Sequence, residues 1–174
     1  MAQVDSASMM ANWINFSTPG EMHTMLAKFD GVWNTEITMW PMPGDPPITA
    51  KGLATNKMIM GGRYQESNNS GDLMGMPFEG LSIIGYDNAR KIFISTWIDN
   101  MGTVSMNMEG PWNSTTNTIT FKGSAFDPIT MKEANYIELL KIIDDNSYML
   151  EMYAPDPVSG KQYKNVEVKY IRKQ

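Results

Sequence analysis

The sequence predicts an all-β protein: a single antiparallel up-and-down β-barrel of about ten strands, with one N-terminal helix covering a barrel end. Beyond residue 31, apolar residues recur at every second position, as they do along half-buried strands. Turn-forming residues interrupt this pattern at intervals of roughly 8–15 residues. The connections are too short for helical crossovers, so successive strands pair antiparallel. Closure into a barrel then removes the two exposed sheet edges.

Ten segments fit the period-two pattern, and each is bounded by turn residues such as Gly, Pro, Asn and Asp. The expected strands are 32–41, 48–60, 62–69, 76–86, 91–99, 103–112, 117–126, 130–142, 147–154 and 162–172. A barrel of this size can hold a small ligand or fill itself with side chains, so the fold alone does not decide the function.

One helix is expected before the first strand. Thr18, Pro19 and Glu21 have the pattern of an N-cap, a first helical residue and the acidic residue of a capping box. Apolar residues then follow at the i, i+3, i+4 and i+7 spacing of one helical face, and the helix is expected to end at about residue 29. The members of this face are Met22, Met25, Leu26 and Phe29.

The expected domain organisation is an N-terminal arm, residues 1–17, and one barrel domain, residues 18–174. The arm is mostly small and polar, and we expect it to lie on the barrel through its few apolar residues. These are Met9, Met10, Trp13, Ile14 and Phe16.

The composition excludes several classes of site and partner. A net charge of −5 without a basic stripe argues against nucleic-acid binding. The absence of cysteine excludes disulfides, zinc thiolates and cysteine nucleophiles, and the single histidine, His23, excludes a site with two imidazoles from one chain. No apolar run approaches the ~20 residues of a membrane span.

The first residues have neither the basic start nor the apolar core of a signal peptide. We therefore expect a cytoplasmic protein, or a periplasmic or secreted one if a signal has been removed ahead of this sequence.

The segment Gly31-Val-Trp33 follows the helix directly and resembles the opening strand of lipocalin-like (calycin) barrels. In those barrels the Trp closes one end and packs against an Arg from the last strand. The resemblance implies structural roles for Gly31, Trp33 and Arg172, with the guanidinium stacked on the indole.

Five motifs in the middle of the chain resemble the uncharacterised bacterial family known as domain of unknown function 1579, over about residues 19–172. They are Met58-Ile-Met-Gly-Gly-Arg-Tyr64, Met76-Pro-Phe-Glu-Gly80, Gly85-Tyr-Asp-Asn88, Phe93-Ile-Ser-Thr-Trp-Ile-Asp99 and Asn100-Met-Gly-Thr103. This resemblance implies a lipocalin-like barrel without an established activity, so it supplies no catalytic residues.

Metal and haem sites have weak support. His23 lies on the helix beside its apolar face. Haem-binding barrels of similar shape place their ligand histidine late in the chain, so a surface or interface role is favoured. The pairs Met58/Met60, Met74/Met76 and Met106/Met108 have a spacing that could bind Cu(I), but methionine more often fills cores or lines apolar pockets. We expect no metal and no cofactor.

Acidic residues on the strands leave an enzyme open as an alternative. Glu79 and Asp99 could form a general acid–base pair, and Glu138 sits between Ile137 and Leu139. An acid on a barrel strand is more often solvent-facing or paired with a cation such as Arg63. There is no nucleophile elbow, phosphate loop or dinucleotide motif.

The leading function hypothesis is non-catalytic binding or carriage of a small, largely apolar ligand inside the barrel. The alternatives are an enzyme of hydrolase or isomerase type that uses carboxylates at the barrel mouth, and a self-associating module with a filled barrel, which would form a homo-oligomer. The expected ligand-binding residues are Arg63, Phe78, Glu79, Trp97, Met106, Met108, Tyr136 and Tyr153.

Overall fold

The strands close an antiparallel barrel, as predicted, in the computed structural model, which describes residues 5–174. Neighbours along the chain pair with each other, and the pairing of the first strand with the last joins the two halves. The strands are β1 (Gly31–Met39), β2 (Ile48–Ile59), β3 (Tyr64–Leu73), β4 (Met76–Asp87), β5 (Ile92–Asp99), β6 (Met106–Gly110), β7 (Trp112–Asn113), β8 (Thr118–Asp127), β9 (Lys132–Asp144), β10 (Ser147–Pro155) and β11 (Gln162–Arg172).

The expected strand 103–112 is two segments, β6 and β7, that both pair with β8 and share one place in the ten-stranded barrel. Pro111 separates them because proline has no backbone N–H for the ladder. The barrel closes where β6 meets β8, with Met108 opposite Gly123. A Cβ on Gly110 would overlap the carbonyl of Thr120, so this close approach requires glycine.

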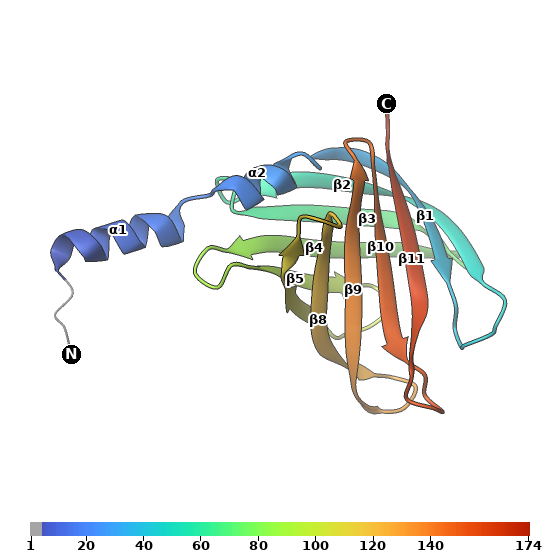
Figure 1. Cartoon of the computed structure of the whole chain (residues 1–174). Coiled ribbons are helices and arrows are strands. Elements are labelled where there is room, and N and C mark those ends of the chain that lie inside the picture. The colour runs from blue at the N-terminus through green and yellow to red at the C-terminus, as the bar shows by residue number, and fades with distance from the viewer. Residues whose placement is uncertain (1–4) are drawn as a thin grey trace.

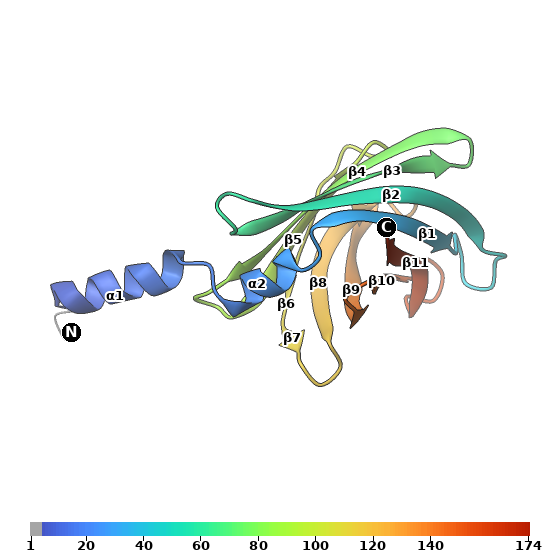
Figure 2. The same ribbon diagram turned by 90° about the horizontal axis from the view of Figure 1, so that it is seen from above.

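The barrel is flattened into two layers of strands. In Figure 1, β9, β10 and β11 cross at a steep angle in front of β1, β2, β3 and β4. The view from above shows β1 and β2 arching over β8–β11 (Figure 2). Residues on the inner faces of these two layers therefore meet in the middle of the molecule.

Helix α2 (Glu21–Ala27) covers one end of the barrel and contacts β2, β3 and β4. It begins later than expected because Gly20, not Thr18, is the N-cap and is extended. The Gly20 N–H donates to Nδ1 of His23 at 3.0 Å, so His23 takes the part in the capping box that was assigned to Glu21. His23 is buried against Tyr86 of β4, and burial lowers the pKa of its imidazole.

The expected N-terminal arm is a second helix, α1 (Ser6–Ser17), which extends away from the barrel instead of lying on it (Figures 1 and 2). Asp5 caps its N-terminus by accepting from the Ser8 N–H at 2.9 Å. The barrel holds its C-terminal end, where Arg63 donates to the Ser17 carbonyl at 2.7 Å and Asn88 to the Thr18 carbonyl at 2.8 Å. Within residues 5–174 no helix is long and apolar enough to cross a membrane.

The end of the barrel beneath α2 is filled by packed side chains. Trp33 is 0% exposed, and its Nε1 donates to the Phe29 carbonyl at 2.9 Å. The Arg172 guanidinium lies 4.1 Å from the centroid of the Trp33 ring, and its Nη1 donates to the Asp30 carbonyl at 2.8 Å. These contacts join the last strand, the first strand and the end of α2 at one point.

Candidate ligand-binding cavity

A cavity of about 320 Å³ lies between the two strand layers. Its walls come from β1–β6 and β9–β11, so nearly the whole barrel contributes to it. Because the core fills the α2 end, the cavity lies toward the opposite end of the barrel. Met39, Leu73 and Met101, which are near the turns at that end, line its mouth.

Apolar side chains make up most of the cavity wall, and they alternate along each strand as the pleat requires. Phe78 and Trp97 stack on neighbouring strands with their ring centroids 6.4 Å apart. A Cβ on Gly80 would overlap the Trp97 ring, so glycine at this position allows the indole to lie flat. The other apolar members include Ile37, Met106, Met108, Leu150, Met152, Val166 and Val168.

The inner end of the cavity is polar, with Glu138, Tyr170, Thr35 and Ser95. Glu138 lies deep in the barrel opposite Met152 and Phe121, and the surface it retains faces the cavity. Burial raises the pKa of its carboxyl to about 7. Burial also raises the pKa of the Tyr170 hydroxyl well above its usual value. The inner end therefore combines a carboxyl group that titrates near neutrality with neutral hydroxyls.

The mouth of the cavity carries two further carboxylates, Asp72 and Asp99, and N–H groups of the protein donate hydrogen bonds to both. Trp97 Nε1 donates to Asp99 Oδ2 at 2.7 Å, and the Met101 N–H donates to Oδ1 at 2.9 Å. Asp99 thus holds the Trp97 indole in place and begins the turn after β5.

Comparison with known proteins agrees with the fold. The crystal structure of Rv2717c from M. tuberculosis superimposes with a TM-score of 0.67 at 12% identity, over 90% of this chain and 100% of that one. Residues 18–172 match the family described as "Protein of unknown function (DUF1579)". The chain belongs to the DUF1579 family. The predicted resemblance is thereby confirmed. No curated protein matches the chain.

Four of the residues expected to bind a ligand line the cavity of this DUF1579 barrel: Phe78, Trp97, Met106 and Met108. Tyr136 lies two residues before Glu138 on the same face of β9 and packs against the core. Met106 and Met108 are a Met-x-Met pair on one strand. Met60 and Met74 instead lie in turns at positive φ, so the other two pairs are not presented together.

The other three expected residues lie outside the DUF1579 cavity. Arg63 is in the β2–β3 turn, where it holds the end of α1. Glu79 is on the outer face of β4, because its neighbour Phe78 points inward. Tyr153 follows a register shift after Met152, and its hydroxyl donates to Glu151 Oε2 at 3.2 Å. Glu151 pairs there with Lys141 at 2.6 Å and Lys164 at 3.4 Å.

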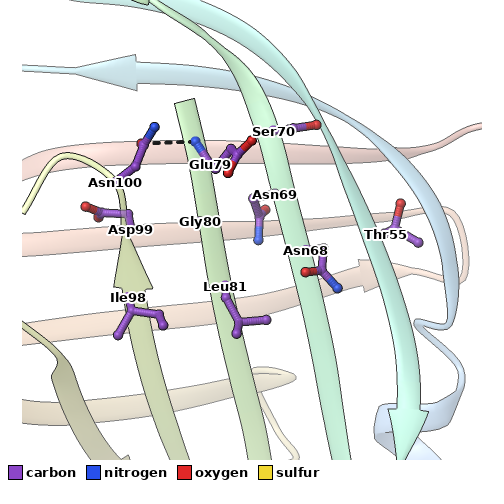
Figure 3. Close-up of a pocket in the computed structure, with 10 residues that line it drawn as sticks. All are labelled: Thr55, Asn68, Asn69, Ser70, Glu79, Gly80, Leu81, Ile98, Asp99 and Asn100. Atoms are coloured by element: carbon purple, nitrogen blue, oxygen red, sulfur yellow. Dashed lines mark hydrogen bonds between the residues drawn. The ribbon is translucent and has the colours of Figure 1, made fainter. Parts of the chain in front are cut away.

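Glu79 and Asp99, which were considered as an acid–base pair, both border a shallow groove of about 490 Å³ outside the strands β2–β5 (Figure 3). Polar side chains from β3 and the loop after β5 line this groove, and the Glu79 N–H donates to Asn100 Oδ1 at 3.1 Å. The Glu79 carboxylate is exposed, whereas the Asp99 carboxylate accepts hydrogen bonds from Trp97 and Met101, so the two carboxylates have different surroundings and no contact joins them as a pair.

Glu138 is the cavity residue that sequence reasoning considered but did not place in the pocket. Its position carried a usable signal, because it shares a strand face with Tyr136 and Leu140. Once Tyr136 is assigned to the interior, alternation assigns Glu138 there too. Within residues 5–174, no group of three or more His, Asp or Glu side chains could hold a metal ion.

Proposed function

We propose that the barrel binds a small, largely apolar molecule and does not change it chemically, as a lipocalin-like carrier or receptor would. The observation that supports this proposal most is the cavity of about 320 Å³, whose size and apolar wall are typical of small-molecule sites. Methionines contribute flexible, polarizable surface that adapts to different apolar shapes. The filled end beneath α2 implies that a ligand enters from the opposite end.

Linear alcohols from hexanol to decanol provide a test of this proposal. We expect binding to strengthen by roughly 0.8 kcal/mol for each added CH₂ and then to stop improving once the chain fills the cavity. Isothermal titration calorimetry measures this series. If none of the alcohols binds to the unmodified protein, the proposal is wrong.

Filling the cavity tests whether binding occurs there. Ala50 lines the cavity from β2, so Ala50→Trp should abolish alcohol binding. Thr49, the preceding residue, is exposed on the other face of β2, and Thr49→Trp is the matched control that should leave the affinity unchanged. Equal binding to both variants would place the ligand outside the barrel.

We propose self-association through α1 as a second candidate function. Its apolar residues recur at intervals of three and four and form one helical face, and they are 53–64% exposed: Met9, Met10, Trp13, Ile14 and Phe16. Covering these faces on two copies would remove on the order of 1,000 Å² from water, near the lower limit for a specific interface. The helix contains no charged residue, which favours a second copy over an anionic membrane surface.

The double substitution Trp13→Gln and Phe16→Gln should convert a concentration-dependent dimer into a monomer, measured by light scattering after size-exclusion chromatography. Asn12→Gln with Asn15→Gln changes the polar face of the same helix and should leave the dimer intact. A monomeric unmodified protein at all concentrations would contradict this candidate.

A further inference from the structure

Glu138 is a carboxyl group held without a partner at the inner end of an apolar cavity. Within residues 5–174, no side chain or backbone group donates a hydrogen bond to its carboxyl oxygens, and none of the ion pairs includes it. The lysines on neighbouring strands, Lys141 and Lys164, point to the outer face and pair with Glu151 there. The protein therefore leaves the charge of Glu138 uncompensated, which is costly for a group inside a barrel.

Other polar side chains that line the cavity also lack a hydrogen-bond partner in the protein. Thr35, Ser95 and Tyr170 also line the cavity and are only 4%, 9% and 8% exposed. In the described part of the chain none of their hydroxyl groups makes a hydrogen bond to another protein group. Among the described residues, the fully buried side-chain atoms without a partner are Asn56 Oδ1 and Asn165 Oδ1, so these four groups still reach the space of the cavity. Four polar groups without a protein partner that line one cavity offer their hydrogen-bonding capacity to the molecule that occupies it.

We propose that the ligand carries a cationic amine on an apolar body, with the ammonium group paired with Glu138 and the apolar part lying along Trp97, Met106 and Met108. This inference rests on the proposed function of the cavity and adds the chemical class of the ligand. A carboxylate accepts up to several hydrogen bonds and attracts a cation, so an ammonium group supplies both the charge and the donors that Glu138 lacks. The Tyr170 hydroxyl, which lies near Glu138 in the same cavity, can accept one of its remaining N–H groups.

The charges elsewhere in the cavity agree with a cationic ligand. Asp72 and Asp99 line the mouth, and the whole chain has a net charge of −5. An anionic head group would meet like charges at both ends of the cavity, whereas an ammonium group would be attracted along the whole path. Lys51 at the mouth is the one basic residue among those that line the cavity.

Three probes of equal length separate the possibilities: n-octylamine, n-octanol and n-octanoate, titrated calorimetrically at pH 8. We expect octylamine to bind at least tenfold more tightly than octanol, and octanoate more weakly than octanol. In the isosteric variant Glu138→Gln, octylamine should lose at least tenfold in affinity while octanol changes by less than about twofold. Glu79→Gln is the matched control, because it changes the net charge of the chain equally but removes an exposed carboxylate outside the cavity.

The outcomes distinguish the inference from the function on which it rests. Octanol binding without a preference for octylamine, a preference that survives Glu138→Gln, or tighter binding of octanoate would each overturn the amine assignment and leave apolar binding intact. If none of the three probes binds to the unmodified protein, the proposed function fails and the assignment fails with it. Octanol binding to Glu138→Gln shows that the variant is folded around its cavity.

The pH dependence provides an independent readout. As the pH falls from 8 to 6, Glu138 becomes protonated and the affinity for octylamine should fall by up to tenfold, while the affinity for octanol stays constant. A parallel change for both probes would contradict the pairing with Glu138. Within residues 5–174, the other titratable groups that line the cavity are Tyr170 on β11 and Asp72, Asp99 and Lys51 at its mouth. Tyr148, Tyr136, Tyr86 and His23 belong to the packed interior beyond it.

Discussion

Replacing Trp33 by alanine should lower the free energy of unfolding by about 3–5 kcal/mol, the range for deleting a buried aromatic side chain. Trp33 has no exposed surface and contacts Phe29, Tyr148 and Arg172, so its loss leaves a hole where three parts of the chain meet. For a chain of 174 residues, this corresponds to a decrease in melting temperature of roughly 10 °C. Urea unfolding followed by circular dichroism measures the free energy of unfolding, and thermal unfolding followed by the same signal measures the melting temperature.

The control for this experiment is Val158→Ala, which shortens a side chain that is 88% exposed in the connection between β10 and β11 and belongs to neither proposed site. We expect this variant to change the free energy of unfolding of the barrel by less than about 0.5 kcal/mol. A Trp33→Ala protein as stable as the unmodified chain would contradict the assignment of Trp33 as the residue that closes the barrel end.

The variant Glu138→Gln should gain stability over the unmodified protein as the pH rises from 5 to 8. The difference between their free energies of unfolding should change by about 2–3 kcal/mol in favour of the variant. Burial raises the pKa of this carboxyl from 4.5 to about 7, so the folded state holds its proton more tightly than the unfolded state does. The resulting stabilisation is complete below pH 4.5 and is lost as the pH rises to about 7 and above. Glutamine does not titrate and removes this contribution.

Urea unfolding at pH 5 and pH 8 gives the stability that each of the two proteins loses between these pH values. Subtracting one loss from the other cancels the titration of all other groups. Glu79→Gln, on the outer face of β4, keeps Glu138 and should lose as much stability between pH 5 and pH 8 as the unmodified protein does. If Glu138→Gln also loses the same stability as the unmodified protein between pH 5 and pH 8, Glu138 is compensated in solution and the cavity does not hold an unpaired carboxyl.

The expected cost of Glu138 is also informative about function. A side chain that destabilises its own fold and makes no contact that holds the barrel together has no structural reason to be there. The cavity and its carboxyl therefore support the ligand-binding proposal together more strongly than either does alone.

Much of the fold could be predicted because it depends on local patterns. The alternation of apolar residues and the turn residues between them predicted the strands, and short connections predicted antiparallel neighbours. The helix α1 was missed because its sequence, rich in Ser and Asn, has weak helix propensity and its apolar face has no partner within the chain. The start of α2 was misplaced because a capping box by His23 is rare compared with one by glutamate.

The candidate site depended on contacts between strands that are distant in sequence. Phe78, Trp97, Met106 and Met108 could be assigned to the interior because each belongs to a clear alternating run. Glu79 and Tyr153 were assigned to the wrong face: each follows a residue that lines the cavity, Phe78 or Met152, so alternation directs its side chain outward. The sequence alone does not show which of two alternating sets faces inward, because a shift of one residue exchanges them. Pairing with the neighbouring strands decides it.

By itself, the sequence determined that this protein is a barrel, that helix α2 and Trp33 close one end of it, and that its interior is rich in methionine and aromatic residues. Only the tertiary structure decided that the far half of the barrel is hollow and that Glu138 reaches its inner end without a partner. The physical reason is that alternation is a property of one strand, whereas a cavity and the surroundings of a charge arise from the way all the strands pack together.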